Sequence, residues 1–305
     1  MAVIAPIAHV GGGVFEPLQV LPPLAALGAY AMRARTLARQ GRPVPTARAA
    51  AFALGIALII AGLTTPVAHI GEELVFAHMA KHLLMADLGA LFLVLGLTGP
   101  ILQPLLATRV AHSLRVLTHP VVAFALWAVD LYVWHLPALY EASISSPPVH
   151  ALQHATFVFF GVTMWFALLG PLPQPEWFGN GAKLLYIVGV RLTGALLANV
   201  FIWSESVFYP AYRGGQVEWD ISPLADQGIA GAIMMLEGSI VTVVLLGWLF
   251  LKTARESEER QELVEFATAH GVDLSERRAA RAVGAGRGEE LRRRLDRSAA
   301  GGSAG

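Results

Sequence analysis

Apolar residues fall in long runs along this chain, and short polar segments separate the runs. A helix needs about 20 apolar residues to cross a bilayer core of about 30 Å. Seven runs reach or approach this length, and they lie at 18–33, 48–68, 79–101, 120–137, 151–170, 183–204 and 227–251. The pattern predicts an all-α integral membrane protein, in which residues 1–252 form a bundle of seven transmembrane helices.

The composition also favours a membrane protein. The 305 residues are 55% hydrophobic and 14% charged, whereas soluble domains carry about 25% charged residues. We therefore expect the lipid bilayer as a partner, and no nucleic acid. The chain has no cysteine, which excludes disulfides and thiolate metal sites. No lysine or arginine precedes Arg33, so a cleaved signal peptide with a basic start is not expected.

Basic residues are distributed unevenly among the loops. The first connection carries five arginines, and the segment from Lys252 onward holds eleven of the 22 basic residues. The N-terminus and the 138–150 loop hold none. Cytoplasmic loops are enriched in Lys and Arg. The distribution predicts a multi-pass protein of a bacterial-type cell membrane, with its N-terminus outside and its C-terminus in the cytoplasm.

The last segment, residues 253–305, mixes glutamate and arginine with scattered apolar residues. This pattern predicts a charged cytoplasmic tail with one or two solvated helices, followed by a disordered end in the sequence Ala-Ala-Gly-Gly-Ser-Ala-Gly. A regulatory or packing appendage is the interpretation we favour.

Histidines gather on the predicted outer face. Seven of the ten lie there, namely His9, His69, His78, His82, His135, His150 and His154. Four of them form two His-x-x-x-His pairs, and residues four apart project from the same side of a helix. The His78/His82 pair continues to Met85 at the i+7 position, and His135 lies between the two pairs in the sequence.

These residue types are typical metal ligands. Neutral imidazole suits Cu, Zn or Fe, and thioether sulfur adds affinity for Cu(I). A single interfacial histidine more often hydrogen-bonds carbonyls or water, and we interpret His9 and His69 in that way. Five histidines at three neighbouring helix ends instead predict a metal or haem site, because polar groups in lipid are costly and are usually functional or paired.

Four charged residues lie well inside the apolar runs, away from their ends: Asp87, Asp130, Arg191 and Glu237. An unpaired charge there would cost at least about 2.5–3.5 kcal/mol. We therefore expect Arg191 to reach toward Asp87 or Glu237. These four residues either stabilise the packing of the helices or form a path for ions or protons, and the sequence leaves both alternatives open.

Several motifs together carry a family resemblance. They are the runs Trp134-His135-Leu136-Pro137-Ala138-Leu139-Tyr140, His150-Ala151-Leu152-Gln153-His154, His78-Met79-Ala80-Lys81-His82-Leu83-Leu84-Met85 and Ser222-Pro223-Leu224-Ala225-Asp226-Gln227-Gly228-Ile229-Ala230-Gly231. In order and span count, residues 15–250 resemble the polytopic cytochrome c oxidase assembly factors called CtaG, of the caa3-oxidase type. The charged tail lies outside the resemblance.

The resemblance implies a non-enzymatic assembly factor that matures a haem-copper oxidase, with copper supply as the usual proposal. It implies cytochrome c oxidase subunits as partners, and we add a possible copper donor protein on the outer side. The family motifs match at His78, His82, His135, His150, His154 and Asp226. We predict copper, as Cu(I), at these residues together with Met85.

Two other classes remain open. A seven-span zinc hydrolase needs three protein ligands and an activated water, with Glu72, Glu73 or Asp226 as the general base. A haem-binding membrane protein needs histidines on facing helices. Zinc and haem are therefore the alternative cofactors. A purely structural subunit, whose histidines only contact oxidase partners, is the other non-enzymatic interpretation.

Overall fold

The computed structural model describes residues 15–64, 69–108, 115–284 and 286–302, and every regular element in these ranges is helical. His9 and His112, and the end of the predicted 48–68 run, lie outside the described residues. The chain divides into two compact units, Met1–Ile240 and Val241–Gly305. The boundary between the units falls inside one long helix, α13 (Pro223–Ala269).

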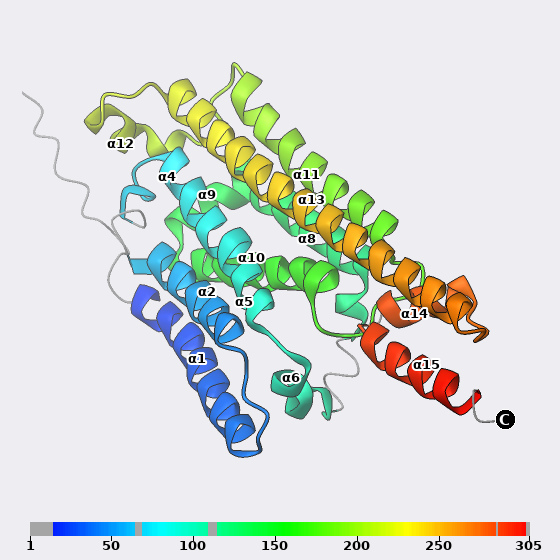
Figure 1. Ribbon diagram of the computed structural model, residues 1–305. Coiled ribbons are helices and arrows are strands. Elements are labelled where there is room, and N and C mark those ends of the chain that lie inside the picture. Colours follow the sequence, from blue (N-terminus) through cyan, green and yellow to red (C-terminus); the bar gives the residue numbers. More distant parts are fainter. Residues whose placement is uncertain (1–14, 65–68, 109–114, 285, 303–305) are drawn as a thin grey trace, which may run out of the picture. The chain divides into compact units, whose positions relative to one another are not determined.

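The first unit holds most of the helices (Figure 1). Besides the first part of α13 they are α1 (Phe15–Arg39), α2 (Thr46–Thr64), α4 (Val75–His82), the π-helical η1 (Leu83–Gly89), α5 (Ala90–Gly96), α6 (Gly99–Leu106), the 3-10 turn η2 (Arg115–Thr118), α8 (Pro120–Trp134), α9 (Pro137–Ser145), α10 (Pro147–Leu169), α11 (Asn180–Trp203), the 3-10 turn η3 (Pro210–Tyr212) and α12 (Arg213–Glu218).

Proline and glycine set several helix boundaries. Helices α8, α9 and α10 begin with Pro120, Pro137 and Pro147. Proline suits the first helical position because its fixed φ is helical and no N–H is needed there. Helix α5 ends at Gly96, directly before the sequence Leu-Thr-Gly-Pro.

The structure confirms an all-helical protein with helices suited to a membrane, but it does not confirm the predicted number of seven spans. Five helical segments are long and apolar enough to cross a bilayer, namely Thr46–Thr64, Val75–Gly96, Pro147–Leu169, Asn180–Trp203 and Pro223–Ala269. The fourth predicted run is broken into α8 and α9, which meet at a bend of 72° and count as a sixth span if taken together. The first predicted run lies in α1, which contains Pro22 and Pro23 and is not among the five. The span count of seven and the orientation remain predictions.

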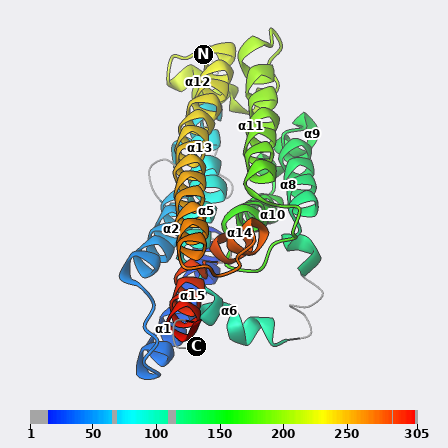
Figure 2. The same cartoon turned by 45° about the vertical axis from the view of Figure 1, so that its right-hand side comes forward.

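Helix α10 packs against several elements of the first unit. It contacts α1, α5, η1, α8 and α9, while α2 packs against α1, α5 and η1. Figure 2 shows α11 alongside α8, and both views place α11 beside the first part of α13. The core between α11 and α13 includes Phe201 and Met234, together with Tyr140 of α9.

Glycines allow the closest helix contacts. A Cβ atom on Gly161 of α10 would lie 2.0 Å from the carbonyl oxygen of Ala86 in η1. A Cβ on Gly231 of α13 would lie 2.6 Å from the carbonyl oxygen of Ala198 in α11. Without a hydrophobic effect between helices in lipid, association depends on such close packing of small residues. Gly161 therefore sets the distance between α10 and the helix that carries His78 and His82.

The second unit contains the rest of α13 together with α14 (Glu276–Gly284) and α15 (Gly288–Gly302). Its own small core is built from apolar side chains of all three helices: Leu263, Ala267, Val283, Leu291 and Leu295. The tail thus consists of three helical segments joined by short turns, the last of which ends at Gly302, and residues 303–305 lie outside the described ranges.

Replacing Gly161 with alanine tests the close approach of α10. We expect Gly161→Ala to destabilise the protein by roughly 1–3 kcal/mol, because overpacking forces the helices apart. Gly194 is the control, since nothing lies within 4 Å of a Cβ built there, so Gly194→Ala should be neutral or stabilising. Thermal unfolding midpoints in detergent measure both, and equal midpoints would contradict the packing argument.

Candidate metal centre

Four histidines from two helices lie close together, each ring next to two others. Helix α4 supplies His78 and His82, and α10 supplies His150 and His154. Ring centroids are separated by 4.3 Å within the first pair and by 4.2 Å within the second. Across the helices the distances are 5.5 Å for His78–His150 and 5.4 Å for His82–His154. The two i, i+4 pairs therefore face each other, and we call these residues the four-histidine cluster.

Three members of the cluster have ligand atoms close enough to share an ion. Nitrogen atoms of His78, His82 and His150 all lie within 4.8 Å of one another. Imidazole nitrogens bind zinc at about 2.0–2.1 Å, so two ligands of one ion are separated by at most about 4.2 Å. Small ring rotations would bring the three nitrogens to this spacing.

Hydrogen bonds orient two of the rings for metal binding. The Nδ1–H of His78 donates to the carbonyl oxygen of Gly71 at 3.1 Å, and that of His154 donates to Oε1 of Gln19 at 2.7 Å. Each bond fixes a tautomer in which Nε2 carries a lone pair, which is the usual arrangement behind metal-bound histidine.

Within the described part of the chain, several ring nitrogens of the cluster are buried without a hydrogen-bond partner. Among the described residues, no hydrogen-bond partner is found for the buried Nε2 atoms of His78 and His154, or for either ring nitrogen of His82. Buried polar atoms are rarely left without a partner. A bound cation would satisfy them, so the residues present fit a metal ion.

Lys81 is the charged neighbour of the cluster. Its side chain is 2% exposed, and Nζ lies 3.1 Å from Nε2 of His150. An ammonium group only donates hydrogen bonds, so Nε2 of His150 accepts. With Lys81 protonated, the Nε2 lone pair that His150 would offer to a metal is therefore engaged by this hydrogen bond.

Three tyrosines enclose the His78 side of the cluster. The ring of Tyr140 lies 5.1 Å from that of His78, and Tyr140 stacks on Tyr209 at 3.8 Å. The hydroxyls of Tyr140 and Tyr212 are 3.3 Å apart. Burial raises the pKa of both Tyr209 and Tyr212, so both remain protonated, and Tyr209 donates to the carbonyl oxygen of His135 at 2.8 Å.

His135 lies next to the cluster. Its Nδ1 donates to the carbonyl oxygen of Leu131 at 2.6 Å, and its ring packs against Phe157 and Phe201. Phe157 also contacts His82, with ring centroids 4.8 Å apart. His135 is thus held against an aromatic neighbour of the cluster, and among the described residues no hydrogen-bond partner is found for its buried Nε2. Its role as a direct ligand remains a prediction.

Met85 faces a different helix. The π-helical segment η1 begins at Leu83, directly after His82. A π-helix bonds i to i+5, so the α-helical i, i+4, i+7 stripe does not continue through it. The sulfur of Met85 would lie 2.7 Å from a Cβ on Gly62 of α2, and the side chain packs with Ile59.

Asp226 acts as a helix cap. Its two carboxylate oxygens accept hydrogen bonds from the backbone N–H groups of Val75 and Phe76, both at 2.9 Å, and from Nε2 of Gln216 at 2.8 Å. Val75 begins α4, and a carboxylate there also complements the positive end of the helix dipole. Asp226 therefore fixes the start of the helix that presents His78 and His82.

The charged residues within the spans form two groups. Asp87 accepts from the indole N–H of Trp165 at 2.8 Å, and its carboxyl group also hydrogen-bonds that of Glu237. Asp130 instead lies beside Trp134 and Thr156.

The sequence analysis expected Arg191 to pair with Asp87 or Glu237, but among the described residues it forms no direct ion pair with a carboxylate. Its guanidinium donates to the carbonyl oxygen of Met235 at 3.1 Å and to the hydroxyl of Ser239 at 2.8 Å. Glu237 lies near enough for electrostatic attraction. The nearby turn of α13 offers uncharged acceptors within reach, and these take the hydrogen bonds.

Sequence reasoning missed two orienting groups and the role of Lys81. Gln19 is a polar residue within the first apolar run, and that position was a signal for a buried partner. Gly71 contributes only its carbonyl oxygen, so its side chain carries no signal. Lys81 stands between the two histidines of a motif, but only the tertiary structure shows that it faces His150.

The fold and the site together define a class of protein: a polytopic helical membrane protein with a cluster of histidines. The chain belongs to the cytochrome c oxidase caa3 assembly factor family, Caa3_CtaG, which matches residues 28–256. The resemblance found in the sequence motifs is thereby confirmed.

Curated mycobacterial relatives are similar to the chain. The uncharacterized proteins Mb0105 of Mycobacterium bovis and MT0111 of Mycobacterium tuberculosis are each 24% identical over 247 residues, which cover 74% of this chain and 37% of the relative. ML1998 of Mycobacterium leprae is 23% identical over 243 residues, with coverages of 72% and 36%. The chain thus spans less than two fifths of the length of these relatives. No solved structure matches it.

Substituting Asp226 separates a capping role from a ligand role. We expect Asp226→Ala to lower the free energy of unfolding by about 2 kcal/mol, because two N–H groups at the start of α4 lose their acceptor. Asp226→Asn should retain part of the stability, since its carbonyl oxygen still accepts. Thermal unfolding and metal content per folded protein measure the two effects. A variant that keeps its unfolding midpoint but loses metal would identify Asp226 as a ligand.

Proposed function

We propose that this protein is an assembly factor for a caa3-type haem-copper cytochrome c oxidase, and that it binds copper at the four-histidine cluster and delivers it to the nascent oxidase. The observation that carries the proposal is the convergence of His78, His82 and His150, whose nitrogen atoms lie within 4.8 Å of one another. Because the chain belongs to a family of caa3 oxidase assembly factors, we infer that the protein that receives the copper is a subunit of this oxidase.

The proposed membrane arrangement has seven spans. It adds α1 and the bent α8–α9 pair to the five long apolar helices. Helix α1 supports this because several of its large apolar side chains are exposed and suit a lipid environment, namely Leu18, Leu21, Leu24 and Met32. With the basic loops in the cytoplasm, the chain is a multi-pass cell-membrane protein, and the cluster lies at the outer face.

Copper is the cargo that suits the donor set best. The chain has no thiolate ligand, and neutral imidazoles bind copper well. The zinc hydrolase has less support, because a general base must be free. Of the three candidate bases, the carboxylate of Asp226 is engaged by three donors, and that of Glu73 accepts from the indole of Trp219. This leaves the exposed Glu72 as the candidate for such a role.

Delivery requires release, and Lys81 provides a physical reason for it. Its ammonium group occupies the Nε2 lone pair of His150. A bound cation must displace this hydrogen bond and is repelled by the adjacent positive charge, which interacts strongly where little water screens it. Lys81 therefore weakens the site and restores the hydrogen bond when the ion leaves.

Removing two cluster ligands tests the copper site. We expect the full chain, loaded anaerobically with Cu(I) in detergent, to retain near-stoichiometric copper, and His82→Ala/His150→Ala to lose most of it. The control is His69→Ala/His270→Ala, which removes two histidines outside the cluster and should bind as the unaltered protein does. Metal analysis and visible absorbance provide the measurement.

Other outcomes of the metal analysis would change the proposed function. Zinc retained in preference to copper would favour the hydrolase, and a Soret band would favour haem. Copper retained by the cluster variant would refute the site. In cells lacking their own copy, restoration of caa3-type oxidase by the cluster variant would show that assembly does not depend on this copper.

Substitution of Lys81 tests the release argument. We expect Lys81→Leu to slow transfer of Cu(I) to a soluble chelator by roughly tenfold, equivalent to about 1.4 kcal/mol, because the competing cation is gone. Lys81→Arg is the matched control and should transfer copper nearly as fast as the unaltered protein, since it keeps the charge. Equal rates for the Leu and Arg variants would exclude a role for this charge.

A further inference from the structure

Charge is separated along the sequence of the second unit. The part of α13 from 253 to 269 carries five glutamates and two arginines, whereas residues 276–297 carry eight arginines and four acidic residues. The excess positive charge therefore belongs to α14, α15 and the turn between them.

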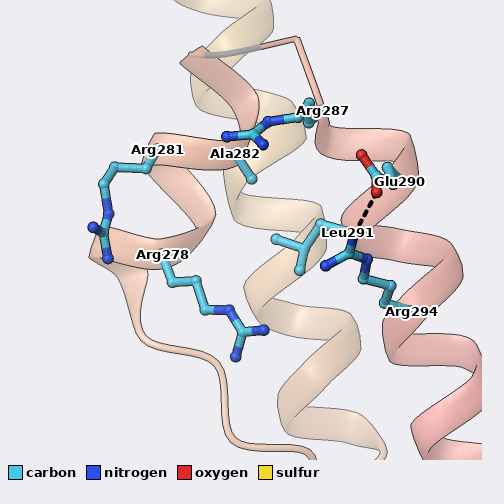
Figure 3. A pocket seen from close by; sticks show the side chains of 7 residues that line it. All are labelled: Arg278, Arg281, Ala282, Arg287, Glu290, Leu291 and Arg294. Atoms are coloured by element: carbon cyan, nitrogen blue, oxygen red, sulfur yellow. Dashed lines mark hydrogen bonds and ion pairs between the residues drawn. The ribbon is translucent and has the colours of Figure 1, made fainter.

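Helices α14 and α15 enclose a hollow of about 250 Å³ with an arginine-rich lining. Its four arginines are Arg278, Arg281, Arg287 and Arg294. Figure 3 shows the guanidinium group of Arg287 near Ala282 and that of Arg294 beside Leu291 and Glu290, while Arg278 extends to the other side of Leu291 and Arg281 points away. Arginines from α14, from α15 and from the turn between them thus border one hollow.

The acidic group of the hollow does not neutralise this charge. Glu290 is the acidic residue of the lining, and it pairs with Arg294 one turn along α15. Among the described residues, no ion pair is found for Arg278 or Arg287. Two guanidinium groups therefore face the hollow without an acidic partner.

The backbone beneath these arginines is held by packing. Leu291 is 7% exposed and packs with Val283 in the core of the second unit. The turn between α14 and α15 includes Gly286, whose φ of +66° favours glycine, and it places Arg287 directly before α15. Arg278 and Arg294 are thus presented by packed helices, which position side chains more accurately than loops do, and Arg287 by the turn between them.

We propose that this hollow binds a phosphate group. Guanidinium presents a planar fork of N–H donors that matches phosphate oxygens, and convergent arginines are the typical receptor for a phosphate dianion or monoester. The group can belong to an anionic lipid headgroup or to a soluble phosphate compound. The cytoplasmic leaflet, which is anionic, adjoins the tail in the predicted orientation. The site is independent of the copper site, and it gives the tail a ligand.

The experiment uses the full chain and two probes. Inorganic phosphate is titrated into protein in a neutral detergent, and lipid is tested in nanodiscs of phosphatidylcholine with or without phosphatidylglycerol. Hydrogen exchange of peptides spanning 276–297 is the readout. Arg278→Gln/Arg287→Gln removes the two unpaired guanidiniums. Arg277→Gln/Arg297→Gln removes the same charge at exposed positions outside the lining and is the control.

Protection by phosphate in detergent, weakened about tenfold or more in the lining variant and unchanged in the control, supports a soluble ligand. Protection only in nanodiscs with phosphatidylglycerol, with the same dependence on the variants, supports a lipid headgroup. Absence of protection by both probes overturns the site. Equal loss in the lining variant and the control also overturns it, because the effect would then be general charge attraction.

Discussion

The close approach of α10 to the helix formed by α4, η1 and α5 is the constraint on which the rest of the first unit depends. Gly161 meets the backbone of η1 with no room for a Cβ. That contact brings one face of α10 within reach of one face of α4, and the two histidine pairs occupy these faces. Because lipid supplies no hydrophobic effect between helices, a larger residue at this contact has no compensating gain.

The surroundings of the four-histidine cluster orient its rings and also place Lys81 beside one of them. Gly71 and Gln19 each accept an Nδ1–H, which leaves the Nε2 lone pairs of His78 and His154 directed inward. Lys81 opposes them by placing a cation against His150. A resident structural metal is better served by ligands without a competing charge, whereas a transferred ion requires a site that opens. Under the proposed function, the same four rings would serve both capture and release of the ion.

The second unit is stabilised in the way that helices of soluble proteins are, by an apolar core with charged residues on the surface. Its three helices share a small apolar core, and ion pairs on α15 run along its own surface at i, i+4 spacing. Such exposed pairs contribute little to stability. Their effect here is to neutralise acidic groups locally, so that the positive charge of α14 and the turn remains available to a ligand.

The sequence by itself determined the helical membrane class, the family and the two in-phase histidine pairs, because hydropathy and i, i+4 spacing are local properties of a helix. Long-range contacts decided the rest. Met85 left the predicted stripe because a π-helical segment follows His82, and Asp226 became a cap because α13 brings it to the start of α4 from 151 residues away in sequence. His135 lies beside the cluster because α8 ends at Trp134 and the chain turns there. Local periodicity does not encode such meetings between distant segments, so only the tertiary structure shows which of the predicted ligands come together.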